Sequence, residues 1–110
     1  MIELMPLDNL RRLFKELAMT RIGEFDGAKL GIDYGKDLSE TFGRYVELLC
    51  NCINSLDSVK SDDLAAQSAL MMIRTHAITL SGFFDAIADD AEFFIKFGDW
   101  AEKHHELKED

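Results

Sequence analysis

Proline, cysteine and basic residues are scarce in this sequence, and each scarcity excludes something. A single proline, Pro6, among 110 residues leaves the rest of the chain free to form helices. Cys50 and Cys52 are the only cysteines. Two residues apart on a helix, their side chains point about 200° away from each other. We therefore predict neither a disulfide between them nor a metal ion shared by them, and we expect reduced thiols packed as small core residues.

Long apolar runs and an amino-terminal signal are also missing. The chain has no run of about 18 apolar residues, which argues against an encoded transmembrane helix. The opening residues, MIELMPLDNLRR, lack the basic and apolar segments of a secretory signal. We expect a cytoplasmic protein that does not enter a membrane.

Positive charge is the third shortage. The chain has 12 lysines and arginines against 21 aspartates and glutamates, a formal net charge of −9. This balance disfavours direct binding to nucleic acid or to an anionic membrane. The acidity is concentrated at the carboxyl-terminal end, where residues 85–110 contain nine acidic and three basic groups.

Apolar residues are abundant and recur with the period of a helix. At 110 residues and 47% apolar composition, the chain is expected to form one globular domain, residues 1–110. Amphipathic segments at 6–22, 38–58, 62–80 and 83–104 indicate an all-α fold, a small bundle of about four helices. The expected core positions of the third segment are Ala66, Leu70, Ile73, Ala77 and Leu80.

Two local signals set the expected helix boundaries. Asp37 and Glu40 have the spacing of a capping box at the start of the second helix. The pair Ser81-Gly82 favours a turn between the third and fourth helices over a kink in one long helix.

Residues 23–37 interrupt the helical pattern, with glycine at every fourth position from 23 to 35. Asp26-Gly27 is typical of a tight turn, and apolar residues alternate at 30, 32 and 34, so a short β-hairpin and a Gly-rich loop both remain open. The glycine spacing matches no phosphate-binding fingerprint. Asp26 and Asp33 do not supply the alternating oxygen ligands of a calcium loop.

Candidate catalytic and metal-binding residues are few. Glu102 and His105 have the Glu-x-x-His spacing of helix-bundle metal sites, but the chain has no second such pair. Arg74 and His76 diverge on a helix and cannot act on one substrate. We therefore predict that the protein is not an enzyme and carries no metal or other cofactor.

The last helical segment is unusually rich in aromatic residues, with five of the eight phenylalanines and the only tryptophan. Phe84 and Phe94 lie on its core face, whereas Phe93, Phe97 and Trp100 form a second stripe. Residues 23–37 or a partner could cover this stripe. We predict that Phe93, Phe97 and Trp100 make an intermolecular contact, with a second copy in a homodimer or with a partner protein.

Four carboxylates, Asp85, Asp89, Asp90 and Glu92, add an acidic patch to the same segment. They form either a solvated surface or a docking site for a basic partner, such as a nucleic-acid-binding protein. We expect a small acidic protein-interaction module: an inhibitor, an immunity or antitoxin-like partner, a chaperone or an adaptor. The alternative is a nucleic-acid mimic that blocks a DNA- or RNA-binding protein, and a metal-dependent enzyme has the least support.

Overall fold

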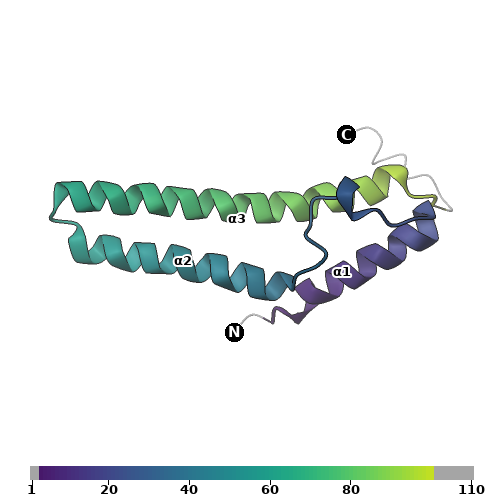
Figure 1. Cartoon of the computed structure of the whole chain (residues 1–110), viewed down its shortest axis with the longest axis horizontal. Helices are drawn as coiled ribbons and strands as arrows, with labels where there is room; N and C mark the ends of the chain where they lie inside the picture. Colours follow the sequence, from purple (N-terminus) through teal and green to yellow (C-terminus); the bar gives the residue numbers. More distant parts are fainter. Residues whose placement is uncertain (1–2, 101–110) are drawn as a thin grey trace.

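The chain folds into three long helices. The computed structural model describes residues 3–100. In this range the helices are α1 (Met5–Leu17), α2 (Leu38–Val59) and α3 (Asp63–Phe97), with no strand among the described residues. Figure 1 shows α2 and α3 side by side as a long hairpin, with α1 packed at one end. The predicted all-α fold is confirmed, but the expected third and fourth helices are a single helix.

The predicted turn at Ser81-Gly82 is not formed. Gly82 lies inside α3, which runs for 35 residues without a break. A glycine inside a helix costs only about 1 kcal/mol relative to alanine, and no proline follows to remove a backbone hydrogen bond. The continuous helix keeps Phe83 packed against Phe42 and Tyr45 of α2, with ring centroids 5.8 and 6.2 Å apart.

The first helix ends in a wider turn. After α1 the chain continues as a π-helical segment, η1 (Ala18–Ile22), which Gly23 closes with a φ of 103°. Side chains are disfavoured in this left-handed conformation, so glycine is the residue that stops the helix here. The helical range 5–22 agrees closely with the predicted 6–22.

Residues 23–37 form a loop and not a β-hairpin. Its one regular piece is a 3-10 turn, η2 (Gly27–Lys29), in which the Asp26 carboxylate accepts a hydrogen bond from the Ala28 N–H at 3.0 Å. The N–H groups of Gly31 and Ile32, which a hairpin would use for pairing, donate instead to the side chain of Asp90. The loop is therefore held by α3 and not by a second strand.

The amino terminus of α2 is capped by a residue of α1. The predicted capping box is not formed: Asp37 makes no cap hydrogen bond and instead pairs with Arg11 at 2.6 Å. The Asp8 carboxylate accepts from both the backbone N–H and the hydroxyl of Ser39, at 3.0 and 2.6 Å. These contacts fix the angle at which α1 meets the hairpin.

The cap by Asp8 makes a testable prediction about pH. Hydrogen bonds from Ser39 to the charged carboxylate lower the pKa of Asp8 below its usual value of 3.8. A lowered pKa stabilises the fold above that value, and this contribution is lost as the pH falls through the folded-state pKa. In urea unfolding between pH 7 and pH 2.5, we expect wild type to be more stable than Asp8→Asn at neutral pH and the difference to shrink below about pH 4. A difference that is unchanged at pH 2.5 would contradict this role.

The hydrophobic core lies where α1, the loop and the last turns of α3 meet. Its fully buried apolar residues are Phe14, Ala18, Ile32, Leu38 and Phe94, and the rings of Phe14 and Phe94 are 5.0 Å apart. Each of these elements contributes at least one residue. The core is therefore confined to one end of the molecule.

Beyond the core, α2 and α3 pack on each other along a single seam. The molecule measures 60 × 30 × 29 Å and its radius of gyration is 18.7 Å, against about 13 Å for a compact chain of this length. Buried or half-buried positions recur at steps of three and four on both helices, the spacing of a coiled coil. They are Phe42, Tyr45, Leu49, Cys52, Leu56 and Val59 of α2, and Ala66, Ala69, Ile73, His76, Leu80 and Phe83 of α3. His76 is thus a packed seam residue.

Candidate interaction surfaces

The four predicted acidic residues separate into two groups. Asp85, Asp89 and Glu92 are exposed, but Asp90 is only 1% exposed. The prediction that Asp90 belongs to the acidic surface patch is therefore wrong, because its side chain points into the contact between α3 and the loop. Of the remaining three, Glu92 also pairs with Lys96 at 3.3 Å.

Asp90 anchors the loop to α3 through three hydrogen bonds. Its carboxylate accepts from the N–H of Gly31 at 2.6 Å, the N–H of Ile32 at 2.9 Å and the hydroxyl of Tyr34 at 2.9 Å. Burial and the neighbouring Asp90 carboxylate raise the pKa of Tyr34, so its phenol remains a donor in the folded protein. Asp90 thus has a structural role that its sequence context, two adjacent aspartates, does not reveal.

Glycine at position 31 allows this anchor. A Cβ atom there would lie 3.3 Å from both the Cα and the Cβ of Ala86 and 3.4 Å from Oδ1 of Asp90. These separations are tight because the loop backbone lies directly on α3. The small side chain of Ala86 permits the same approach from the helix side.

The predicted aromatic stripe is covered in part from within the chain. Phe93 is half-buried against the core, and the Trp100 indole N–H donates to the Phe94 carbonyl at 3.0 Å. The Arg21 guanidinium carbon lies 4.8 Å from the centroid of the Trp100 ring, a cation–π contact. Phe97 is 65% exposed, and it is the member of the stripe that offers an open surface.

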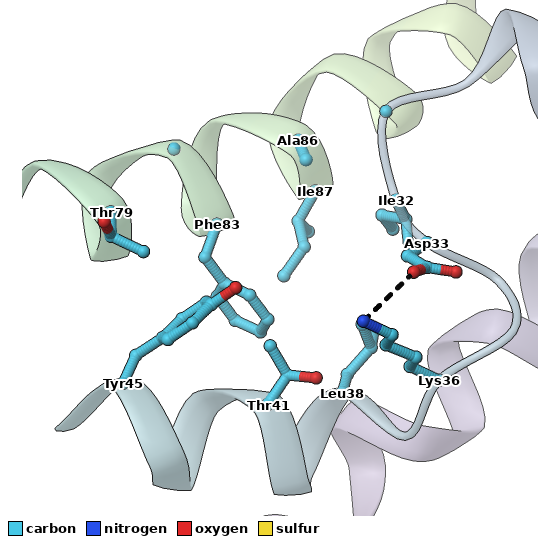
Figure 2. A pocket seen from close by; sticks show the side chains of 12 residues that line it. Ile32, Asp33, Lys36, Leu38, Thr41, Tyr45, Thr79, Phe83, Ala86 and Ile87 are labelled. Carbon is cyan, nitrogen blue, oxygen red and sulfur yellow. Dashed lines mark ion pairs between the residues drawn. The ribbon is translucent and has the colours of Figure 1, made fainter. Parts of the chain in front are cut away.

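A pocket of about 300 Å³ lies between the loop, α2 and α3. Figure 2 shows Tyr45 and Phe83 side by side in it, with Ile87 and Leu38 further along and the Asp33–Lys36 ion pair of 3.9 Å near the loop. Its volume is at the lower end of the range for ligand sites. Its polar lining comprises the hydroxyl groups of Thr41, Tyr45 and Thr79 and one carboxylate, that of Asp33, which is paired with Lys36.

Metal-binding and nucleophilic groups do not converge within residues 3–100. No cluster of three or more histidine, cysteine, aspartate or glutamate side chains in this range could hold a metal ion. Cys50 and Cys52 are free thiols. Cys52 lies in the seam, as expected of a core residue. Cys50 is exposed, so the prediction that it packs in the core is wrong. The Glu102 and His105 pair lies outside the described residues. No helix in this range is both long and apolar enough to cross a membrane.

A row of exposed side chains runs along α3. Its residues recur every seven positions on the side of α3 that faces away from α2, and we call Leu64, Met71, Ile78, Asp85 and Glu92 the outer ridge. Leu64 is 79% exposed and Met71 is 69% exposed. The ridge is apolar near the tip of the hairpin and acidic near the core. Reading the third segment as a seven-residue repeat could have found its apolar part, because these three residues fall outside the expected core stripe.

Comparison with known proteins adds no functional information. No protein-family model, curated protein or solved structure matches this chain.

Proposed function

We propose that this protein is a small acidic interaction module that binds another protein along the outer ridge of α3. The observation that carries the proposal is the exposure of large apolar side chains in register on a rigid helix. Leu64, Met71 and Ile78 are 79%, 69% and 53% exposed, so no helix among residues 3–100 covers them. Complete burial of one such side chain stabilises a complex by about 1.5–3 kcal/mol, so covering this row provides a substantial driving force.

The acidic end of the ridge supports a partner with a complementary charge. Asp85 and Glu92 continue the row of Leu64, Met71 and Ile78, and the whole ridge spans about 42 Å at 1.5 Å per residue. A partner helix with an apolar stripe and basic residues toward one end would match both parts. The carboxylates, with Asp89 beside them, would accelerate association and set the orientation of the partner.

At the carboxyl end of α3, Phe97 lies about 140° around the helix from Glu92, so a partner that contacts both the outer ridge and Phe97 must wrap around α3. Phe93 and Trp100 are held against the chain itself, so we assign them to the support of this region and Phe97 to contact with the partner. The nucleic-acid mimic is less well supported than protein binding, because Asp90 is withdrawn from the acidic track and Lys96 neutralises Glu92.

Position-specific photo-crosslinking tests where a partner binds. A photo-reactive amino acid in place of Met71 should form an adduct with one defined protein in cells of the source organism. The same group in place of Met72, which lines the groove between α2 and α3 about 100° around the helix, should not. An adduct formed equally from both positions, or from Met72 alone, would argue against the outer ridge.

Affinity for the captured protein supplies the quantitative prediction. We expect Met71→Ser with Ile78→Ser to weaken binding by about 100-fold, because truncating anchors at the centre of an interface costs about 2 kcal/mol or more. Met72→Ser is the matched control and should change the affinity less than about threefold. Asp85→Asn with Glu92→Gln should mainly slow association and reduce its dependence on salt. Calorimetry and stopped-flow mixing measure these quantities, and unchanged affinity in the double serine variant would overturn the proposal.

A further inference from the structure

The hairpin has a second exposed surface, separate from the outer ridge. Where the hairpin extends past α1, it is a pair of helices with no third layer (Figure 1). The loop, the pocket that it lines and the groove beside Met72 lie on one side of the pair, because their lining residues Thr41 and Ser55 of α2, and Met72 and Thr79 of α3, are spaced by multiples of seven and so share one face of each helix. On the opposite side of the seam, Ile53, Leu70 and Ala77 are exposed.

Apolar residues from both helices occupy this opposite side. They recur at seven-residue steps, and because α2 and α3 are antiparallel they fall on the same side of the seam. We call this set the flat face: Val46 and Ile53 of α2, and Leu70, Ala77 and Phe84 of α3. Ile53, Leu70 and Phe84 are each about half exposed, Ala77 is exposed and Val46 is half-buried.

The charge distribution around the flat face restricts what can cover it. Residues 48–56 contain no aspartate, glutamate, lysine or arginine, and residues 64–84 contain only Arg74. The whole chain has a net charge of −9, so two copies repel each other wherever their charged surfaces meet. The flat face is the part of the α2–α3 hairpin where two copies can approach each other without that repulsion.

The shape of the surface also matches a second copy. Two antiparallel helices with an apolar stripe on one side are half of a four-helix bundle, and a two-fold axis brings two such halves together through identical residues. From Leu70 to Phe84 the face is about 21 Å long, and at two helix widths of about 10 Å each it covers roughly 400 Å² in projection, about half of the roughly 800 Å² that each partner contributes to a standard interface.

We infer that two copies of this protein associate through their flat faces, so that the two hairpins form a four-helix bundle. The outer ridge of each α3, on a different side of that helix, stays exposed in the pair. The assembly would therefore present two outer ridges to partners, and its formation is independent of the protein-binding function proposed above.

Analytical ultracentrifugation of the wild-type chain is the first test. We expect a species of about 25 kDa, twice the chain mass of 12.5 kDa, at 50 µM. Because an uncharged face is buried while the rest of each chain is acidic, raising the salt from 0.05 to 0.5 M should leave the dimer intact or tighten it. A wild-type chain that remains monomeric at 50 µM, or a dimer that dissociates in high salt, would overturn the inference.

A pair of charge-introducing variants locates the interface. Ala77→Glu places a carboxylate at the centre of the flat face and should raise the dimer dissociation constant by about 100-fold or more, because the contact would bury two like charges. Thr75→Glu adds the same charge to an exposed position on the other side of α3 and should leave the dimer unchanged. Glutamate is a good helix former, so both monomers should keep wild-type circular dichroism.

Ile53→Glu repeats the test on α2. It should dissociate the dimer as Ala77→Glu does, while the monomer stays helical. If neither flat-face variant dissociates the dimer, or if Thr75→Glu dissociates it equally, the inference is wrong.

Discussion

Replacing Asp90 with alanine should destabilise the fold by about 4 kcal/mol, because the donors that it satisfies cost about 1–3 kcal/mol each when left without a partner. Its carboxylate accepts from two loop N–H groups and the Tyr34 hydroxyl, and the side chain is 1% exposed. A domain of this size has a total stability of about 5–15 kcal/mol. The variant should therefore be close to unfolding at room temperature, with the loop released first.

Asp89 provides the matched control for this prediction. It is the adjacent residue, carries the same charge and is exposed, so Asp89→Ala should change the free energy of unfolding by less than about 0.5 kcal/mol. Asp90→Asn keeps one acceptor oxygen but presents an amide N–H group to the loop donors, and its stability should be intermediate. Urea titrations followed by far-ultraviolet circular dichroism measure all three. If Asp89→Ala and Asp90→Ala lower the free energy of unfolding equally, the buried hydrogen bonds of Asp90 contribute no more to stability than the loss of one negative charge does.

Truncation of Phe94 should be the most damaging core substitution, at about 3–5 kcal/mol. Phe94 is 2% exposed and packs against Phe14 from α1, so its loss leaves a cavity where the elements of the core meet. Phe97, one helical turn later and 65% exposed, should cost less than about 1 kcal/mol when changed to alanine. The same substitution is thus expected to be several times more destabilising at Phe94 than at Phe97.

Trp100, the only tryptophan, offers a convenient probe for this comparison. Its indole donates to the Phe94 carbonyl and contacts Arg21, so its fluorescence reports on the end of the molecule that holds the core. Thermal unfolding of Phe94→Ala and Phe97→Ala should be followed by fluorescence and circular dichroism together. If Phe97→Ala is as destabilising as Phe94→Ala, Phe97 belongs to the core and its place in the proposed partner surface is lost.

Local sequence patterns predicted the helices well because helix formation depends mainly on periodicity and on the scarcity of proline. The ranges of α1 with η1 and of α2 follow the amphipathic segments closely. Gly82 was misread as a turn because its cost in a helix is small compared with the packing of Phe83 beside it. Such a balance depends on what faces the helix, which a local pattern does not contain.

Non-local contacts explain the other differences. The cap on Ser39 comes from Asp8, 31 residues earlier, and the partners of Asp90 lie 56 to 59 residues away. Asp90 resembles its exposed neighbour Asp89 in every local respect, so only the position of the loop distinguishes them. Contacts of this kind follow from the fold and not from spacing along the chain.

The exposed apolar surfaces of α3 could not be located from the sequence. The acidic, aromatic-rich last segment drew attention to α3, but Leu70 and Ala77 were assigned to its core and are exposed. The predicted core stripe assumed a helix inside a bundle, where neighbouring helices cover a wide face. Here α3 has a single helical neighbour over most of its length, so its buried stripe is the narrower seam of a coiled coil.

The confinement of the core to one end makes the remainder of the hairpin an adjustable spacer. Because the seam repeats every seven residues, inserting seven residues into α2 and seven at the facing level of α3 would preserve side-chain register. Each such insertion would move the tip outward by about 10 Å and leave the contacts of Phe14, Asp90 and Phe94 untouched. Natural or designed insertions of this kind can therefore lengthen the hairpin in fixed increments without altering the hydrophobic core.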